Sequence, residues 1–184
     1  LHRLDSENGN FTVIDATCPF VKKIHKIAEE NTNDYTYFLL FCDPGHPEAI
    51  GTMSYARGQS LAFSSLEELM AYDLGNKLPI LCAQTTQNLV EFKKIKKFLK
   101  NLCTNAKIFD TICSVTENRQ NEATKIAKES DLMIVIGGRE SSNTHKLYDL
   151  CSLECPTVWI ESITDLLTDF PDNAKCVGIT AGAS

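Results

Sequence analysis

Short apolar runs alternate with amphipathic stretches along the whole chain. The runs YTYFLLF at 35–41 and DLMIVIGG at 131–138 are almost continuously apolar, which is typical of strands buried on both faces of a parallel sheet. The stretches between such runs place apolar residues at helical spacing, as in Phe20, Val21, Ile24, Ile27 and Ala28. This alternation predicts an α/β fold with parallel strands and right-handed crossovers.

The chain also contains an internal repeat. FTVIDATCPFVKKIHKIAEEN near the start resembles AKIFDTICSVTENRQNEATKIAKES in the middle, and both pass from an apolar strand through an Asp-x-x-Cys corner into a helix. Cys18 and Cys113 lie 95 positions apart, and His46 and Ser141 keep the same offset. The repeat predicts two tandem similar domains, 1–103 and 104–184. Each is expected to be a small, mainly parallel sheet of about four strands flanked by helices.

The two copies differ at their ends. The first copy continues after Thr86 into a closing helix, whereas the second stops at Ser184, the matching position. The beginning of the chain is equally abrupt. We therefore expect these residues to be a piece of a longer polypeptide.

Composition narrows the class of protein. The net charge of −6 argues against a broad basic face for nucleic acid or anionic membrane, and no apolar run approaches the length of a membrane span. The eight cysteines accompany no export signal, which favours a reducing cytoplasm over a disulfide framework.

Polar residues gather in the loops that follow the strands. In a parallel sheet these loops form the ligand-binding edge, where helix N-termini present N–H groups. The candidates are small hydroxyl and amide side chains that could donate hydrogen bonds to phosphate oxygens: Thr85, Thr86, Ser141, Ser142, Asn143 and Ser184. Each could equally be a helix N-cap, and the matching positions in both copies leave the two interpretations about even. No Walker or dinucleotide fingerprint is present, so a nucleotide is not indicated.

Three further residues suggest chemistry at the same edge. Glu48 could be a helix N-terminal acid that pairs with the helix dipole, or a proton donor beside a bound anion with His46 as a contact. Cys18 and Cys113 could converge if the two copies pack with their strand ends facing. Such thiolates could ligate iron or zinc or form a redox pair, although a metal site needs a third ligand.

The remaining cysteines suggest less. Cys42, Cys82, Cys103 and Cys176 are interpreted as packing residues. Cys151 and Cys155 have the spacing C-x3-C without a second pair, which is a weak zinc signal.

Six motifs, in order, carry a family resemblance: DATCPFV, GHPEAIGTM, AQTT, ICSVTENRQ, SSNTHKL and VGITAGAS. They resemble the 4-hydroxy-3-methylbut-2-enyl diphosphate reductase (IspH/LytB) family, which acts in isoprenoid biosynthesis. The resemblance implies reductive dehydroxylation of that allylic diphosphate to isopentenyl and dimethylallyl diphosphate. It also implies three similar α/β domains in a pseudo-threefold arrangement around a 4Fe–4S cluster, with this chain covering the second and third.

The resemblance also assigns roles to residues. Cys18 and Cys113 correspond to two of the three cluster ligands, and the third cysteine would lie outside this chain in the missing N-terminal domain. Glu48 corresponds to the acid that protonates the leaving hydroxyl, and Thr85 to the threonine near it. The substrate-binding residues implied are His46, Thr85, Thr86, Ser141, Ser142, Asn143 and Ser184.

Ferredoxin or flavodoxin is the expected electron donor, and residues 1–184 alone are expected to be inactive. Two other classes remain open from the residues themselves. One is a non-enzymatic anion-binding repeat scaffold with inert cysteines. The other is a zinc-dependent hydrolase that uses Cys18, Cys113 and His46.

Overall fold

The computed structural model describes residues 14–167 and 174–182 and divides the chain into two compact units. The first unit comprises Leu1–Thr85 and Lys94–Thr111, and the second comprises Thr86–Lys93 and Ile112–Ser184. The two units therefore alternate along the chain: residues 86–93 belong to the second unit, and residues 94–111 belong to the first again. The repeat had suggested a single boundary between residues 103 and 104. Within the described residues, no helix has the length and apolar character needed to cross a membrane.

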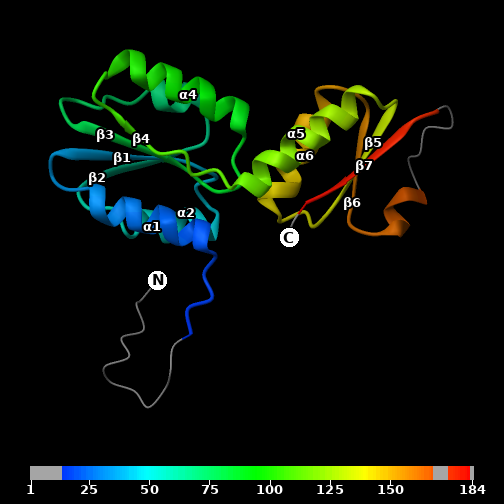
Figure 1. The fold of residues 1–184 in the computed structure, drawn as a ribbon, viewed down its shortest axis with the longest axis horizontal. Helices are drawn as coiled ribbons and strands as arrows, with labels where there is room; N and C mark the ends of the chain where they lie inside the picture. The colour runs from blue at the N-terminus through cyan, green and yellow to red at the C-terminus, as the bar shows by residue number, and fades with distance from the viewer. Residues whose placement is uncertain (1–13, 168–173, 183–184) are drawn as a thin grey trace. The chain divides into compact units, whose positions relative to one another are not determined.

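The first unit is a parallel sheet with helices on both faces (Figure 1). Its strand order is β2-β1-β3-β4. The elements are α1 (Pro19–Asn31), β1 (Thr36–Phe41), α2 (Pro47–Met53), β2 (Gln59–Phe63), α3 (Leu66–Met70), β3 (Leu78–Ala83), α4 (Leu89–Leu102) and β4 (Lys107–Ile108). The first turn of α4 belongs to the second unit.

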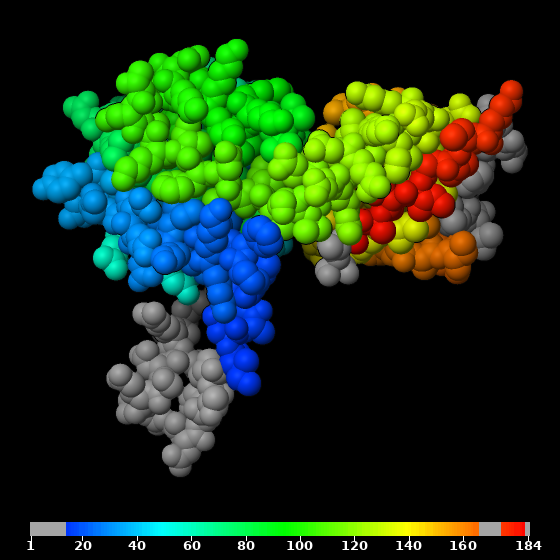
Figure 2. Space-filling view, in the orientation of Figure 1, coloured from blue at the N-terminus to red at the C-terminus, as the bar shows by residue number. Residues whose placement is uncertain are grey.

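Both faces of the first sheet are covered. Phe38, Leu40 and Ile80 pack with Ile24 and Ile27 of α1 in one buried cluster. Figure 1 shows α1 and α2 on one face and α4 on the other, and Figure 2 shows surface residues of α1 in blue and of α4 in green. This double coverage explains why β1 is apolar at consecutive positions rather than alternating ones.

The second unit repeats this order of elements. Its parallel sheet has the order β6-β5-β7, which matches β2-β1-β3 of the first unit. The elements are α5 (Ser114–Lys128), β5 (Leu132–Ile136), α6 (Ser142–Ser152), β6 (Thr157–Ile160), the 3₁₀ helix η2 (Ile163–Leu167) and β7 (Val177–Ala181). The predicted α/β fold and its internal repeat are thus confirmed.

The two sheets differ in their strand number. The sheet of the first unit has four strands, as expected, but that of the second has three among the described residues. The predicted opening strand of the second copy instead becomes β4, where Lys107 pairs with Ile80 and Ile108 with Leu81 of β3. The corresponding strand of the first copy falls largely on residues 11–13, outside the described residues, and Ile14 is not in a strand.

Thr111 fixes the end of this added strand. Its hydroxyl Oγ1 accepts a hydrogen bond from the Ala83 N–H at 2.8 Å and donates one to the Ala83 carbonyl at 2.7 Å. Thr111 is only 3% exposed. The chain that leads into Cys113 is therefore attached to the end of β3, two residues before Thr85.

Replacing Thr111 by valine is expected to destabilise the first unit. Valine keeps the shape of threonine but leaves the buried Ala83 N–H and carbonyl without partners, which costs about 1–3 kcal/mol of unfolding free energy. Urea denaturation of the purified protein measures this loss. The control Thr104→Val replaces an exposed threonine in the turn after α4 and should change stability by less than about 0.5 kcal/mol. Equal stability of the two variants would contradict the role of Thr111.

His25 of α1 is expected to make stability depend on pH. Burial lowers the pKa of His25 below its ordinary value of 6.5, against smaller opposing effects of Glu48 and Asp15. The ring stacks on Tyr55 with centroids 4.4 Å apart, and its buried Nε2 has no hydrogen-bond partner among the described residues. The unfolded chain thus takes up a proton more readily, so stability present above pH 6.5 is lost as the pH falls through the lowered pKa.

His25→Phe keeps a stacking ring and removes the titration. Its unfolding free energy should therefore depend less on pH below neutrality than that of the wild-type protein. Urea denaturation midpoints at several acidic pH values make the comparison. Parallel pH profiles would show that His25 is not responsible.

Candidate functional site

Glu48 binds the loop that follows β3. Its Oε1 accepts a hydrogen bond from the Thr85 N–H at 2.7 Å, and its Oε2 accepts one from the Thr85 hydroxyl at 2.7 Å. Thr85 is 7% exposed, and Glu48 is half-buried. Because β1 and β3 are neighbours in a parallel sheet, the loops after them meet at one edge. The carboxylate of Glu48 therefore does more than pair with the dipole of its own helix.

His46 is the N-cap of α2. Its Nδ1 accepts a hydrogen bond from the Glu48 N–H at 3.1 Å. In the neutral ring the proton must then lie on Nε2, which leaves that nitrogen as a hydrogen-bond donor. The cap thus fixes the tautomer of His46 and also positions the backbone of Glu48.

Gln84 connects the two loops of this edge and was not singled out from the sequence. Its side chain is buried, and its Oε1 accepts a hydrogen bond from the Asp43 N–H at 2.9 Å. The loop after β1 is thereby attached to the residue that precedes Thr85. A glutamine next to two threonines gives no sign in the sequence of this structural contact.

The start of α6 collects the candidate residues of the second unit. Ser141 is the N-cap, and its hydroxyl accepts a hydrogen bond from the Thr144 N–H at 3.3 Å. The Ser142 hydroxyl lies 3.1 Å from the hydroxyl of Thr86. Asn143 is 5% exposed, and its Oδ1 has no hydrogen-bond partner among the described residues. A buried amide without a partner is costly, so this position is suited to a ligand or a further segment of chain.

Two glycines let the strands approach this helix start closely. A Cβ atom on Gly137 or Gly182 would collide with the side chain of Thr144, and that on Gly182 would lie 2.8 Å from the Thr144 Cα. Gly137 also has a φ of 154°. The absence of side chains at the ends of β5 and β7 therefore brings their backbone against the first turn of α6.

Cys18 and Cys113 occupy equivalent positions, the N-caps of α1 and α5. Their backbone angles are similar, with φ −50° and ψ 135° for Cys18 and φ −64° and ψ 133° for Cys113. Neither side chain makes a capping hydrogen bond; Cys18 is exposed and Cys113 half-buried. Both cysteines thus stand at the N-terminal ends of helices with side chains that no capping hydrogen bond occupies.

Three of the other six cysteines differ from this pair. Cys42, Cys82 and Cys151 are buried, and burial raises the pKa of their thiols to about 12, 12 and 11. They behave as packing residues. Cys176 is exposed, so its interpretation as a packing residue was wrong; its segment enters the outer strand β7.

The aspartates of the two Asp-x-x-Cys corners both pair with lysine. Asp15 contacts Lys22 at 2.8 Å, and its Oδ1 accepts a hydrogen bond from the Thr17 N–H at 2.9 Å. The hydrogen bonds from Lys22 and then Thr17 hold the pKa of Asp15 well below its usual range. Asp110 forms an ion pair with Lys96. The hydrogen bond from the Thr17 N–H connects Asp15 to the residue just before Cys18.

Comparison with known proteins identifies the family. The model of the family described as LytB protein matches residues 2–184. The chain belongs to the LytB family. A relative from Helicobacter pylori (strain Shi470), named 4-hydroxy-3-methylbut-2-enyl diphosphate reductase, is 38% identical over 179 residues, covering 97% of this chain and 65% of the relative. A Campylobacter hominis protein of the same name is 39% identical with the same coverage.

A solved structure has a similar fold. The E-1-hydroxy-2-methyl-but-2-enyl-4-diphosphate reductase from Plasmodium falciparum matches with a TM-score of 0.84 and 29% sequence identity. The match covers 93% of this chain and 55% of that structure. The chain thus spans somewhat less than two thirds of the length of these relatives.

The structure brings together some of the predicted site residues. Glu48 and Thr85 contact each other in the first unit, and Thr86 and Ser142 do so in the second. Ser184 lies outside the described residues. Cys18 and Cys113 belong to different units, so their proximity stays a prediction. The residues that the structure describes include no group of three or more His, Cys, Asp or Glu arranged to hold a metal ion.

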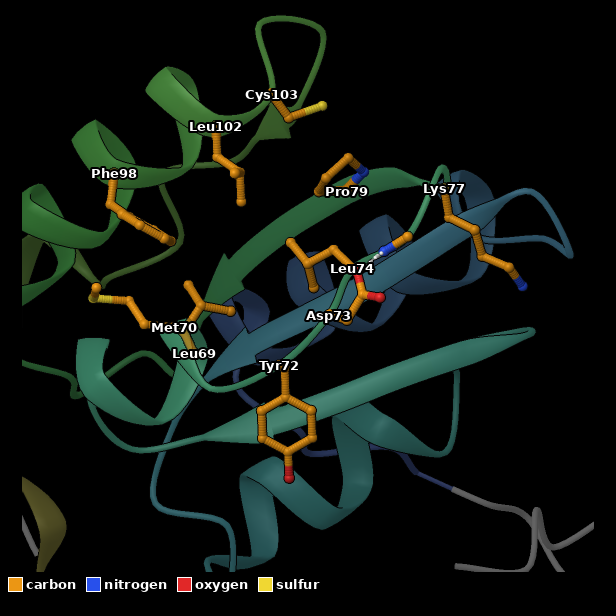
Figure 3. Close-up of a pocket in the computed structure, with 11 residues that line it drawn as sticks. Leu69, Met70, Tyr72, Asp73, Leu74, Lys77, Pro79, Phe98, Leu102 and Cys103 are labelled. Atoms are coloured by element: carbon orange, nitrogen blue, oxygen red, sulfur yellow. Dashed lines mark hydrogen bonds between the residues drawn. The ribbon is translucent and has the colours of Figure 1, made fainter.

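A separate cavity of about 290 Å³ lies in the first unit, at the opposite edge of its sheet. Figure 3 shows Met70, Phe98 and Leu102 around it, beside Pro79 near the beginning of β3. Glu48 and Thr85 lie instead beyond the carboxyl ends of β1 and β3. This cavity is therefore distinct from the candidate site.

Proposed function

We propose that the protein containing this chain is an iron–sulfur reductase that converts 4-hydroxy-3-methylbut-2-enyl diphosphate to isopentenyl and dimethylallyl diphosphate. Membership of the LytB family and the names of its relatives support the activity. The observation in the molecule that carries it is the pairing of the Glu48 carboxylate with the N–H and hydroxyl of Thr85.

The reaction needs two electrons and two protons. The allylic C–O bond breaks, the hydroxyl leaves as water with one proton, and the second proton adds to the reduced allyl group. Glu48 and Thr85 suit the first proton transfer, since they share a hydrogen bond between a carboxylate oxygen and a hydroxyl. A protonated Glu48 can donate to the Thr85 oxygen while the Thr85 hydroxyl donates onward to the leaving group.

The oxygens of a bound diphosphate need hydrogen-bond donors around them. Ser142 and Thr86 supply hydroxyls 3.1 Å apart, and Ser141 caps α6, whose first N–H groups suit an anion. Asn143 adds a buried amide whose oxygen has no partner among the described residues. His46 adds an Nε2–H donor when its ring is neutral. We assign these residues, together with Ser184, to binding the diphosphate.

Cys18 and Cys113 fit the role of cluster ligands. Both are accessible thiols at helix N-caps and make no competing cap hydrogen bond. They would hold a 4Fe–4S cluster together with a third cysteine from outside this chain. When bound, that cluster supplies the two electrons and a Lewis-acidic iron for the substrate hydroxyl. Ferredoxin or flavodoxin would be the electron donor.

Anaerobic reconstitution of the full-length protein tests this function. Iron and sulfide should give a brown protein that consumes the allylic diphosphate with a chemically reduced mediator and releases both isoprenoid diphosphates. A colourless protein after reconstitution would overturn the proposal, and zinc uptake without iron would point to the hydrolase instead. Residues 1–184 alone should give no turnover, because they supply only two of the three cysteine ligands.

A further inference from the structure

Gln120 of α5 binds the loop between β3 and α4 through both polar atoms of its side-chain amide, Nε2 and Oε1. Its Nε2 donates a hydrogen bond to the Gln87 carbonyl at 3.0 Å, and its Oε1 accepts one from the Leu89 N–H at 3.2 Å. Gln120 is 3% exposed. All of these residues belong to the second unit.

This contact stabilises the beginning of α4 from another helix. The first N–H groups of a helix have no partner within the helix itself, and Leu89 is the first residue of α4. Gln87, two residues earlier, is also buried. The amide of Gln120 supplies a donor for one backbone group and an acceptor for the other, whereas a carboxylate of the same length lacks the donor and an apolar side chain lacks both.

The loop that Gln120 binds also carries two candidate site hydroxyls, those of Thr85 and Thr86. Thr86 directly precedes Gln87, and its Oγ1 lies 3.1 Å from the Ser142 hydroxyl. Thr85, one residue further back, bonds Glu48 through both its N–H and its hydroxyl. A shift of the backbone at Gln87 would therefore change the direction of both threonine hydroxyls.

The same helix begins directly after Cys113. Gln120 lies two turns into α5, or about 10 Å along the helix axis at 1.5 Å per residue. A helix of this length is stiff. Through Gln120, the helix that Cys113 caps therefore holds the backbone that directly follows Thr85 and Thr86.

We propose that Gln120 is a positioning residue for the reductase reaction. It holds the backbone at 87–89 and thereby fixes the orientation of the Thr86 hydroxyl and of the adjoining Thr85 hydroxyl. The catalytic part of this inference rests on the proposed function. Gln120 closes the motif ICSVTENRQ but was not assigned a role from the sequence, because a glutamine in the middle of a helix does not reveal which distant backbone groups it contacts.

Hydrogen exchange tests the positioning part without turnover. In Gln120→Met, which keeps the length of the side chain but loses the amide, peptides covering residues 85–92 should exchange at least about tenfold faster. Peptides covering β5 should not change. The control Asn121→Leu alters the next residue of α5, which is exposed, and should leave the loop protected. Unchanged protection in Gln120→Met would overturn the inference.

Kinetics of the reconstituted full-length enzyme test the catalytic part. At equal iron content, Gln120→Met should lower kcat by about tenfold to a hundredfold, the effect of a small misplacement of reacting groups, with a smaller change in KM. Asn121→Leu should keep the wild-type kcat. If Gln120→Met fails to fold, Gln120→Glu keeps the acceptor for Leu89 but loses the donor to Gln87, and kcat should still fall at least about tenfold.

The outcomes separate the two proposals. An active wild-type enzyme whose Gln120 variants keep kcat within about twofold would overturn the role of Gln120 and leave the proposed function standing. An inactive, colourless wild-type protein would overturn the proposed function and the catalytic role of Gln120 with it. The exchange experiment would then still decide whether Gln120 holds the loop.

Discussion

Replacing Glu48 by glutamine is expected to lower kcat of the full-length protein in the proposed reaction by about 10²–10⁴-fold, the usual contribution of a general acid. Glutamine has the shape of glutamate, and its amide oxygen can still accept the hydrogen bond from the Thr85 N–H. Its NH₂ group can face the Thr85 hydroxyl, which then accepts instead of donating. The loop stays in place, but no proton can pass from residue 48 to the leaving hydroxyl.

The measurement is steady-state kinetics with equal cluster loading, and KM should change much less than kcat. Glu67→Gln is a matched control, because Glu67 also lies in the first turn of a short helix, α3, but is exposed. It should keep the wild-type kcat. A Glu48→Gln enzyme with near wild-type kcat would remove Glu48 from the mechanism.

Replacing Cys113 by serine is expected to abolish both the cluster and the activity. Iron–sulfur clusters are held by thiolates, and a serine hydroxyl is a much poorer ligand for iron. After anaerobic reconstitution, Cys113→Ser should bind little iron and lack the visible absorbance of the wild-type protein. Because Cys113 is a half-buried N-cap without a capping hydrogen bond, serine should leave α5 folded.

Cys176→Ser is the matched control for this experiment. Cys176 is an exposed thiol next to β7 and has no assigned role, so its loss should leave iron content and kcat unchanged. Circular dichroism should show that both variants are folded. Full iron content in Cys113→Ser would remove this cysteine from the ligand set and weaken the repeat argument that pairs it with Cys18.

Local pattern was sufficient to predict the order of elements from α1 to α4 and from β4 to β7. The apolar run at β1 and the Asp-x-x-Cys corners before α1 and α5 are properties of neighbouring residues, and strand, helix and cap preferences act over such short distances. The repeat then implied the common strand order, because two similar sequences bury similar faces. The accessible caps at Cys18 and Cys113 follow from the same local signals.

Pairing between distant segments was not predictable in this way. The strand before Cys113 looks like the first element of the second copy, yet Lys107 and Ile108 complete the sheet of the first unit. Strand pairing is chosen by which sheet edge offers unpaired backbone groups, here the edge of β3, and Thr111 secures that choice. A sequence repeat contains no information about which edge is available.

The sequence by itself determined the α/β class, the duplication and the residue types of the candidate site, because these depend on local periodicity and on the chemistry of short motifs. Only the tertiary structure joined Glu48 to Thr85, Thr86 to Ser142 and Gln120 to the loop before α4. These bonds connect residues more than 30 positions apart. A hydrogen bond between side chains that far apart exists only when packing of the sheets and helices brings its donor and acceptor within reach.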